Sequence, residues 1–191
     1  MKNGKRLLMV ICAVILLACF YFLATRNSLV ALKEEVEMQQ SQIETTLQRR
    51  SDLIPNLVAT VKGYANHEEE IFTEIANARE KLVGSIESGD MESISEASNT
   101  LDSALGRLLA ISENYPDLKA SEQFIALQDE LAGTENRIAV ARQYYNEKVN
   151  NYNTKVQTFP ASIVAKVSGY SPVQYFEADD GAQEVPEVNF E

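Results

Sequence analysis

The chain has 191 residues, 45% of them apolar, with 17 basic and 28 acidic side chains and a net charge of −11. This apolar content is enough for a hydrophobic core, which excludes a wholly disordered chain. Residues 1–26 contain four basic side chains and no acidic one, so all of the acidity lies in the rest of the chain. A surface of that charge repels phosphate, which excludes a nucleic-acid-binding function.

Residues 7–24 are predicted to form a membrane anchor, because they contain no charged side chain. As a helix they span about 27 Å, close to the roughly 30 Å hydrocarbon layer of a bilayer. Three basic residues lie in the flank formed by residues 1–6, whereas Arg26 and Lys33 follow the anchor. The positive-inside rule therefore predicts a single span with a cytoplasmic N-terminus and the remaining chain on the other side.

Two other interpretations of this segment stay open. A cleaved secretory signal requires a site with small residues, and no clear site precedes Arg26. A lipoprotein signal is the second, because the sequence from Leu16 to Cys19 resembles a lipobox and its cleavage would leave Cys19 lipidated. The apolar run continues past Cys19, which favours a spanning helix. Cys12 and Cys19 are the only cysteines, so the rest of the chain has no disulfide or cysteine-based metal site.

Residues 28–159 are predicted to form a helical bundle, because apolar residues recur every three or four positions. The first helix continues from the anchor to about residue 64. Pro55 is expected to kink or break it, since proline removes a helical donor, and Asp52 is expected to cap a restart.

Turn signals divide the rest of this range. Asn66 is predicted to cap the second helix, and Ser88–Asp90 separates it from the third. Asn114–Asp117 ends the third helix, and the last one is predicted over Leu118–Phe159, ended by Pro160. The predicted fold is all-α: an N-terminal transmembrane helix followed by a long-helix antiparallel four-helix bundle.

Residues 160–191 are predicted to form an acidic extended C-terminal tail, because glycine, proline and six acidic residues interrupt the helical period. Two short segments within it, Val173–Phe176 and Val188–Phe190, are expected to dock on the bundle in extended form.

The residues also resemble the LemA family over nearly the whole chain. The matching blocks, in chain order, are Arg49–Val58, Thr60–Ala65, His67-Glu68, Tyr115–Ala120, Leu127–Leu131, Thr134–Ile138, Ala141-Arg142, Tyr145-Asn146, Tyr152-Asn153, Phe159-Pro160, Tyr175–Ala178 and Pro186–Phe190. The resemblance implies a bacterial membrane protein with one N-terminal span and a four-helix bundle, and it implies no reaction, cofactor or catalytic residue. It also gives a pointer to partners in membrane quality control, such as HtpX-type proteases or TPM-domain proteins.

The first candidate motif surrounds Pro55 and is formed by Arg49, Arg50, Asp52, Pro55 and Asn56. A charged residue in a bundle seam commonly fixes the register of the helices, so the motif is interpreted as structural before it is interpreted as a partner-binding or ligand-binding site. The carbonyl group that Pro55 leaves without a donor is expected to be satisfied by Asn56 or Arg50.

The second candidate motif is a repeated Tyr-Asn pair, formed by Tyr145 and Asn146 and, one heptad later, by Tyr152 and Asn153. Paired interhelical hydrogen bonds are the expected role, and a ladder for stacking substrate is the alternative. His67, the only histidine, lies among glutamates, and that pattern is typical of an exposed helix start rather than of a zinc site.

No nucleophile elbow, phosphate-binding loop or dinucleotide fingerprint occurs, so the chain is not expected to be an enzyme or to bind a cofactor or metal. The leading hypothesis is a membrane-anchored scaffold or adaptor of the bacterial cell envelope. Its expected location is the inner membrane, and itself or envelope quality-control proteins are its candidate partners. A ligand- or peptide-sensing bundle, with a pocket near Pro55 and the Tyr-Asn pairs, is the alternative.

Overall fold

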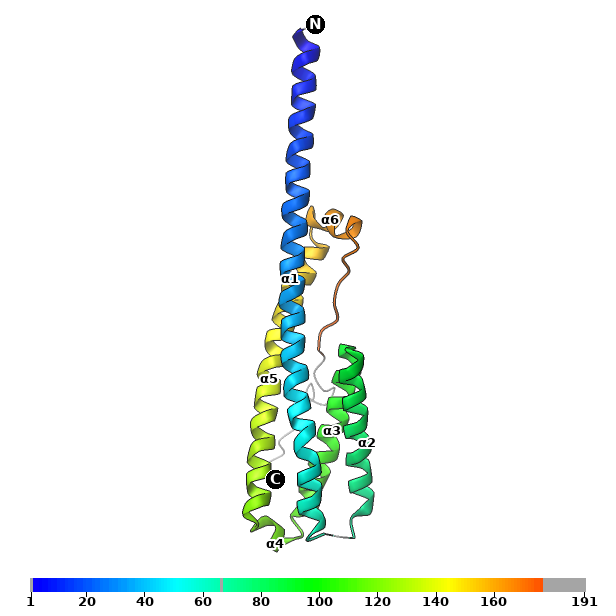
Figure 1. Cartoon of the computed structure of the whole chain (residues 1–191), viewed down its shortest axis with the longest axis vertical. Coiled ribbons are helices and arrows are strands. Elements are labelled where there is room, and N and C mark those ends of the chain that lie inside the picture. Colours follow the sequence, from blue (N-terminus) through cyan, green and yellow to red (C-terminus); the bar gives the residue numbers. More distant parts are fainter. Residues whose placement is uncertain (1, 66, 177–191) are drawn as a thin grey trace, which may run out of the picture. The chain divides into compact units, whose positions relative to one another are not determined.

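The computed structural model describes residues 2–65 and 67–176, and these residues form helices and no β-strand. The helices, drawn in Figure 1, are α1 Lys2–Lys62, α2 Glu69–Ser88, α3 Met91–Ser112, α4 Pro116–Lys119, α5 Glu122–Gln157 and α6 Ala161–Val167. The prediction of an all-α chain with a helical bundle is confirmed. The chain divides into two compact units: residues 1–39 with 147–173 form the anchor unit, and residues 40–146 with 174–191 form the bundle unit.

The bundle unit contains the short helix α4 and four longer helical segments, which are residues 40–62 of α1, α2, α3 and residues 122–146 of α5. Short connections join them, so neighbours in the chain run antiparallel. Each segment presents an apolar stripe to the core. Fully or almost fully buried residues of these stripes are Ile43, Leu47, Ile54, Leu57, Val61, Ile75, Leu82, Ile94, Leu101, Leu108, Phe124, Ile138 and Tyr145.

Local signals fix several helix ends as predicted. Gly89 takes a left-handed conformation (φ 70°) after α2, which a residue with a Cβ adopts only at a cost. Asp90 caps α3 by accepting a hydrogen bond from the backbone N–H of Ser93 at 3.0 Å. The Ser93 hydroxyl, and then its backbone N–H, lower the pKa of the Asp90 carboxyl. The cap predicted at Asn66 lies outside the described residues, and the N-cap residue of α2 is Glu68.

The last predicted helix differs from the structure at both ends. Pro116 starts a separate short helix, α4, and α5 begins only at Glu122. The C-terminal end of α5 is Gln157, three residues before Pro160, because a residue in front of proline is disfavoured in the α conformation. The tail is also less extended than predicted, since α6 occupies Ala161–Val167.

The prediction of a break at Pro55 is wrong. Helix α1 continues through this residue to Lys62. Asp52 therefore caps no restart: it lies inside the helix, where its carboxylate accepts a hydrogen bond from Gln48 at 3.0 Å.

In the anchor unit, the N-terminal part of α1 is exposed on all sides. An 18-residue window of this helix has a mean hydropathy of 2.9 with none of it buried, which makes α1 the one candidate transmembrane helix among the described residues. Burial begins directly after the apolar run, at Thr25 and Leu29, and continues at Val36. The spacings of four and seven residues place these positions on one face, so α1 changes there from a lipid-compatible helix to a packed one.

Candidate functional site

The motif around Pro55 connects α1 to each of the other three helices of the bundle unit. Arg49 pairs with Glu130 of α5 at 2.6 Å, and Arg50 pairs with Asp102 of α3 at 2.6 Å. The carbonyl oxygen of Ser51 accepts a hydrogen bond from Nε of Arg79 on α2 at 2.9 Å. Three consecutive residues thus bind three different helices, which supports the register-fixing interpretation of the motif.

The two arginine pairs of this motif differ in burial. The side chain of Arg50 is 6% exposed, whereas that of Arg49 is 62% exposed. A buried guanidinium requires a carboxylate partner to offset its lost hydration, while an exposed pair contributes little to stability. The Arg50–Asp102 pair is therefore the one on which the packing of α1 against α3 depends.

Arg79 explains why Pro55 does not interrupt α1. Proline lacks the N–H that would bond to the carbonyl four residues earlier, which here belongs to the fully buried Ser51. A buried carbonyl without a partner is unfavourable by about 1–3 kcal/mol. The guanidinium of Arg79 supplies the missing donor, so neither Asn56 nor Arg50 has the predicted role. Asn56 is exposed, and its carbonyl accepts from the hydroxyl of Thr60 at 2.8 Å.

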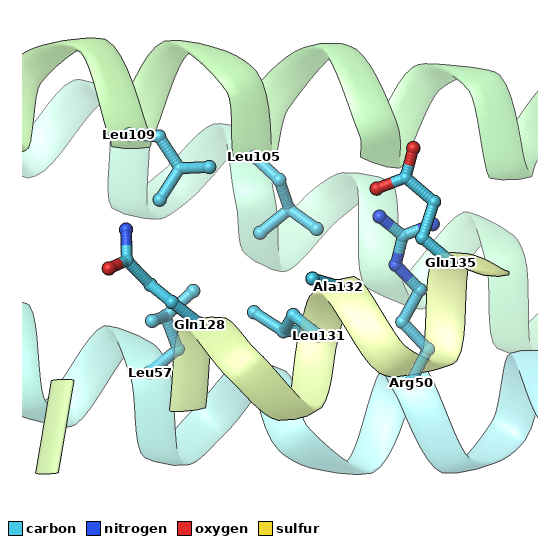
Figure 2. Close-up of a pocket in the computed structure, with 8 residues that line it drawn as sticks. All are labelled: Arg50, Leu57, Leu105, Leu109, Gln128, Leu131, Ala132 and Glu135. Atoms are coloured by element: carbon cyan, nitrogen blue, oxygen red, sulfur yellow. The ribbon is translucent and has the colours of Figure 1, made fainter. Parts of the chain in front are cut away.

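A cavity of about 100 Å³ lies beside this motif in the bundle unit (Figure 2). Leu57 of α1, Leu105 and Leu109 of α3 and four residues of α5 line it together with Arg50, and the Arg50 and Glu135 side chains lie at one end of it. Ligand pockets usually have about 300–1,000 Å³, so this cavity does not support the small-ligand alternative. Pro55 is not among its lining residues.

In the anchor unit, the second Tyr-Asn pair holds the segment that follows α6. The Tyr152 hydroxyl donates to the Ser171 carbonyl at 3.1 Å. The Asn153 amide makes two bonds to Val173: it donates to the carbonyl and accepts from the N–H, both at 2.8 Å. One asparagine thus satisfies both backbone groups of one residue, as a neighbouring strand would.

In the bundle unit, the first Tyr-Asn pair repeats this arrangement. The Tyr145 hydroxyl donates to the Gln174 carbonyl at 3.0 Å. The Asn146 amide donates to the Phe176 carbonyl at 2.9 Å and accepts from its N–H at 2.8 Å. The Phe176 side chain is buried, and the Arg142 guanidinium carbon lies 4.4 Å from its ring centroid. A cation over the face of a desolvated ring is attractive, so Phe176 anchors the segment.

The distance between the two Tyr-Asn pairs along α5 matches the length of the extended segment between the residues that they hold. Seven helical residues separate the pairs on α5 and advance about 10.5 Å. The residues that they hold are offset by three, from Ser171 to Gln174 and from Val173 to Phe176. Three extended residues advance about 9–10 Å, so one heptad of the helix fits three residues of the held chain.

The predicted interhelical role of the Tyr-Asn pairs is therefore replaced by bonds to an extended backbone. Pro172 fits this arrangement because the N–H groups that are bound belong to Val173 and Phe176, so its missing donor is not needed. Both tyrosines are buried. Burial raises the pKa of Tyr145 to about 12, and burial, followed by the nearby Tyr170 and Glu37, raises the pKa of Tyr152. Both hydroxyls accordingly keep the proton that they donate.

His67 is exposed, and the neighbouring Glu68 accepts a hydrogen bond from the Tyr115 hydroxyl at 2.9 Å. This bond raises the pKa of Tyr115. Within residues 2–65 and 67–176, no group of three histidine, cysteine or acidic side chains is placed to hold a metal ion.

The fold and these contacts define a membrane-associated helical protein, with one candidate N-terminal transmembrane helix and a bundle helix that holds extended polypeptide. The LemA family model matches residues 39–190, and the chain belongs to this family.

The chain is also similar to several individual proteins. Magnetosome protein MamQ of Magnetospirillum gryphiswaldense is 27% identical over 92% of this chain and 74% of its own length. Magnetosome protein MamQ 2 of Paramagnetospirillum magneticum is 28% identical over 79% of this chain and 64% of its own length. Protein LemA of Metamycoplasma hominis is 29% identical over 84% of this chain and 73% of its own length. None of these names denotes an enzyme.

Proposed function

We propose that this protein is a membrane-anchored, non-enzymatic scaffold or adaptor of the bacterial cell envelope, which acts through protein-protein contacts of its bundle. The observation that carries the proposal is the double binding of extended backbone by α5, through Asn153 in the anchor unit and Asn146 in the bundle unit. A helix that binds backbone rather than side chains is suited to accept extended segments of different sequence.

The exposure of the held residues supports backbone recognition. Ser171, Pro172, Gln174 and Tyr175 are all exposed, and Gln174 donates a surface hydrogen bond to Glu92 of α3 at 3.1 Å, so side chains contribute less to binding than the backbone does. Phe176 alone is buried, which makes an aromatic anchor the one sequence requirement of this surface. The chain's own tail is thus the resident occupant, and extended segments of partner proteins with an aromatic residue are the proposed competitors. The peptide-sensing alternative uses the same surface.

The experiment that tests this proposal measures binding of a fluorescent peptide with the sequence of residues 170–177 to the membrane-reconstituted chain truncated after Gly169. We expect saturable binding by fluorescence polarisation. Replacing Asn146 and Asn153 together by alanine removes four hydrogen bonds to the peptide backbone. At about 1 kcal/mol each, the affinity is expected to fall by two orders of magnitude or more.

Two further peptides separate backbone from side-chain recognition. A peptide with Ser171 and Gln174 replaced by alanine is expected to bind within a few-fold of the original, because both side chains are exposed and the bond of Gln174 to Glu92 lies at the surface. A Phe176→Ala peptide is expected to bind much more weakly. No binding of any peptide to a truncated chain that keeps its helical circular dichroism would contradict the proposal.

The location within the cell is part of the proposal. The three basic residues within residues 1–6 support an N-terminus in the cytoplasm and a bundle outside it, anchored in the inner membrane. An Ala139→Cys substitution at an exposed position of α5, in a Cys12→Ala, Cys19→Ala background, tests this. We expect labelling of intact spheroplasts by an impermeant maleimide. Protection until the membrane is lysed would place the bundle in the cytoplasm.

Anchoring through a lipid on Cys19 is the alternative. Helix α1 continues without interruption through Cys19 and has exposed apolar side chains on both sides of it, which supports a spanning helix. The intact mass of the purified protein distinguishes the two, because lipidation at Cys19 removes residues 1–18 and adds acyl chains.

Envelope quality-control proteins and a second copy of the chain are the proposed partners. Val140 and Tyr144 of α5 are 52% and 51% exposed and lie one helical turn apart, which supports self-association through α5. Sedimentation of the wild-type chain and of a Val140→Lys variant in detergent is the measurement, and an unchanged monomer in both would exclude this partner.

A further inference from the structure

The segment from Phe159 to the end of α6 presents three large apolar side chains to solvent. Phe159 is 77% exposed, Ile163 is 58% exposed and Val167 is 72% exposed. Ile163 and Val167 lie one turn apart on α6, and Phe159 precedes the helix, next to Pro160. On the opposite side of α6, Ala161, Val164 and Ala165 are buried. Helix α6 is therefore apolar on both sides, and one of these sides lacks a covering element among the described residues. We call Phe159, Ile163 and Val167 the α6 apolar face.

The place of α6 in the anchor unit indicates what covers this face. Figure 1 draws α6 beside the part of α1 where its exposed apolar run ends, and α6 and residues 1–39 belong to the anchor unit. The first buried positions on α1 are Thr25 and Leu29, directly after the predicted anchor 7–24. Leu29 follows Ala24 by five residues, which is about 7.5 Å along the helix. The headgroup layer on each side of a bilayer is about 5–8 Å thick, so α6 lies at its depth.

The charges around α6 agree with this position. Residues 148–176 contain three lysines and no acidic residue, and residues 1–33 contain five basic residues and no acidic one. All 28 acidic residues of a protein with net charge −11 lie elsewhere. Lys166 of α6 and Arg26 of α1 are both exposed. Basic side chains next to an apolar face are the composition that binds the surface of an anionic bilayer.

We infer that the α6 apolar face inserts into the interfacial layer of the lipid bilayer and forms a second membrane contact besides the transmembrane helix. The occupant of this face is the acyl-chain and headgroup boundary of the leaflet on the side of the bundle, with Lys166 and Arg26 against anionic lipid phosphates. The contact holds the anchor unit against the membrane through α6 as well as through α1. The inference rests on the anchor of the proposed function.

The absence of tryptophan from the chain allows a direct test with single reporters. The full-length Ile163→Trp variant is reconstituted into vesicles of zwitterionic and anionic phospholipids, some brominated near the headgroup end of the acyl chains. We expect a blue-shifted emission, loss of about half of the intensity in brominated vesicles, and stronger quenching with anionic lipid. The matched control is Val140→Trp, at a position of similar exposure on α5. Lys148 of α5 pairs with Glu35, which follows the anchor by more than two helical turns. Val140 is eight residues, or about 12 Å along α5, farther from the anchor than Lys148. Its emission is expected to stay unquenched.

A third variant, Leu16→Trp, separates failure of this inference from failure of the anchor. Quenching of Leu16→Trp by deeply brominated lipids without any quenching of Ile163→Trp would overturn the α6 contact and leave the anchor intact. A blue shift of Ile163→Trp without bromine quenching would assign the face to a protein neighbour and overturn the lipid contact. Absence of quenching in both variants would overturn the anchor and the inference together.

Discussion

Replacing Asp102 by alanine is expected to lower the free energy of unfolding by about 3 kcal/mol. The substitution leaves the guanidinium of Arg50, 6% exposed, inside the bundle without its carboxylate partner. Breaking a buried pair by removing one member is unfavourable by about 3–5 kcal/mol, and the lower value applies here because Asp102 itself is 34% exposed. Thermal unfolding of the detergent-solubilised protein, followed by circular dichroism, is expected to show a midpoint lower by about 10 °C.

The adjacent pair provides the control for this result. Arg49 and Glu130 have the same 2.6 Å separation as Arg50 and Asp102, but Arg49 is 62% exposed. Glu130→Ala is expected to lower the stability by less than about 1 kcal/mol. A double variant, Arg50→Met with Asp102→Leu, is expected to recover most of the lost stability, because apolar residues of similar volume replace a buried pair well. Equal losses for Asp102→Ala and Glu130→Ala would contradict the role given to burial.

Replacing Arg79 by methionine is expected to lower the free energy of unfolding by about 1–3 kcal/mol. The Ser51 carbonyl then loses the hydrogen bond that Arg79 donates in place of the N–H that Pro55 lacks. The same substitution in a Pro55→Ala background is expected to have a much smaller effect. Alanine at position 55 supplies the helical N–H that proline lacks, so Ser51 no longer depends on α2.

A double-mutant cycle with denaturant unfolding measures this dependence. The expected coupling between the Pro55 and Arg79 substitutions is about 1–2 kcal/mol. Arg49→Met provides a matched control, since it removes an arginine of the motif around Pro55 without affecting the hydrogen bond to the Ser51 carbonyl. Strict additivity of the Pro55 and Arg79 substitutions would show that Arg79 does not act through the Ser51 carbonyl.

The parts of the fold that could be predicted from the sequence are those determined by residues close to one another in the chain. Gly89 and Asp90 end one helix and start the next because a left-handed glycine and a capping carboxylate act within a few positions. The N-terminal apolar run is likewise a property of adjacent residues. The break predicted at Pro55 does not occur because the Ser51 carbonyl accepts a hydrogen bond from Arg79, which lies 28 positions after Ser51 on another helix. No pattern around Pro55 specifies such a distant partner.

The candidate site was predictable in its residues but not in its contacts. The seven-residue repeat of Tyr-Asn pairs is visible in the sequence, and both pairs make hydrogen bonds from α5. Their partners are backbone groups of residues 171–176, and backbone groups have no side-chain signature. Asp102, the partner of Arg50, was also missed, because a carboxylate on an amphipathic helix has the same appearance whether it is solvated or paired.

In the proposed function, the surface of α5 that the tail covers becomes available to other extended segments. Amide hydrogen exchange of the whole chain tests this release of the tail most directly. The N–H groups of Val173 and Phe176 donate to the side chains of Asn153 and Asn146, not to the backbone of a helix. We predict that they exchange by local release of the tail, at least about ten times faster than core amides such as those of Ile75 and Leu101. Exchange of Val173 and Phe176 at the same slow rate as the core would mean that the tail leaves only on global unfolding, and would contradict the adaptor function.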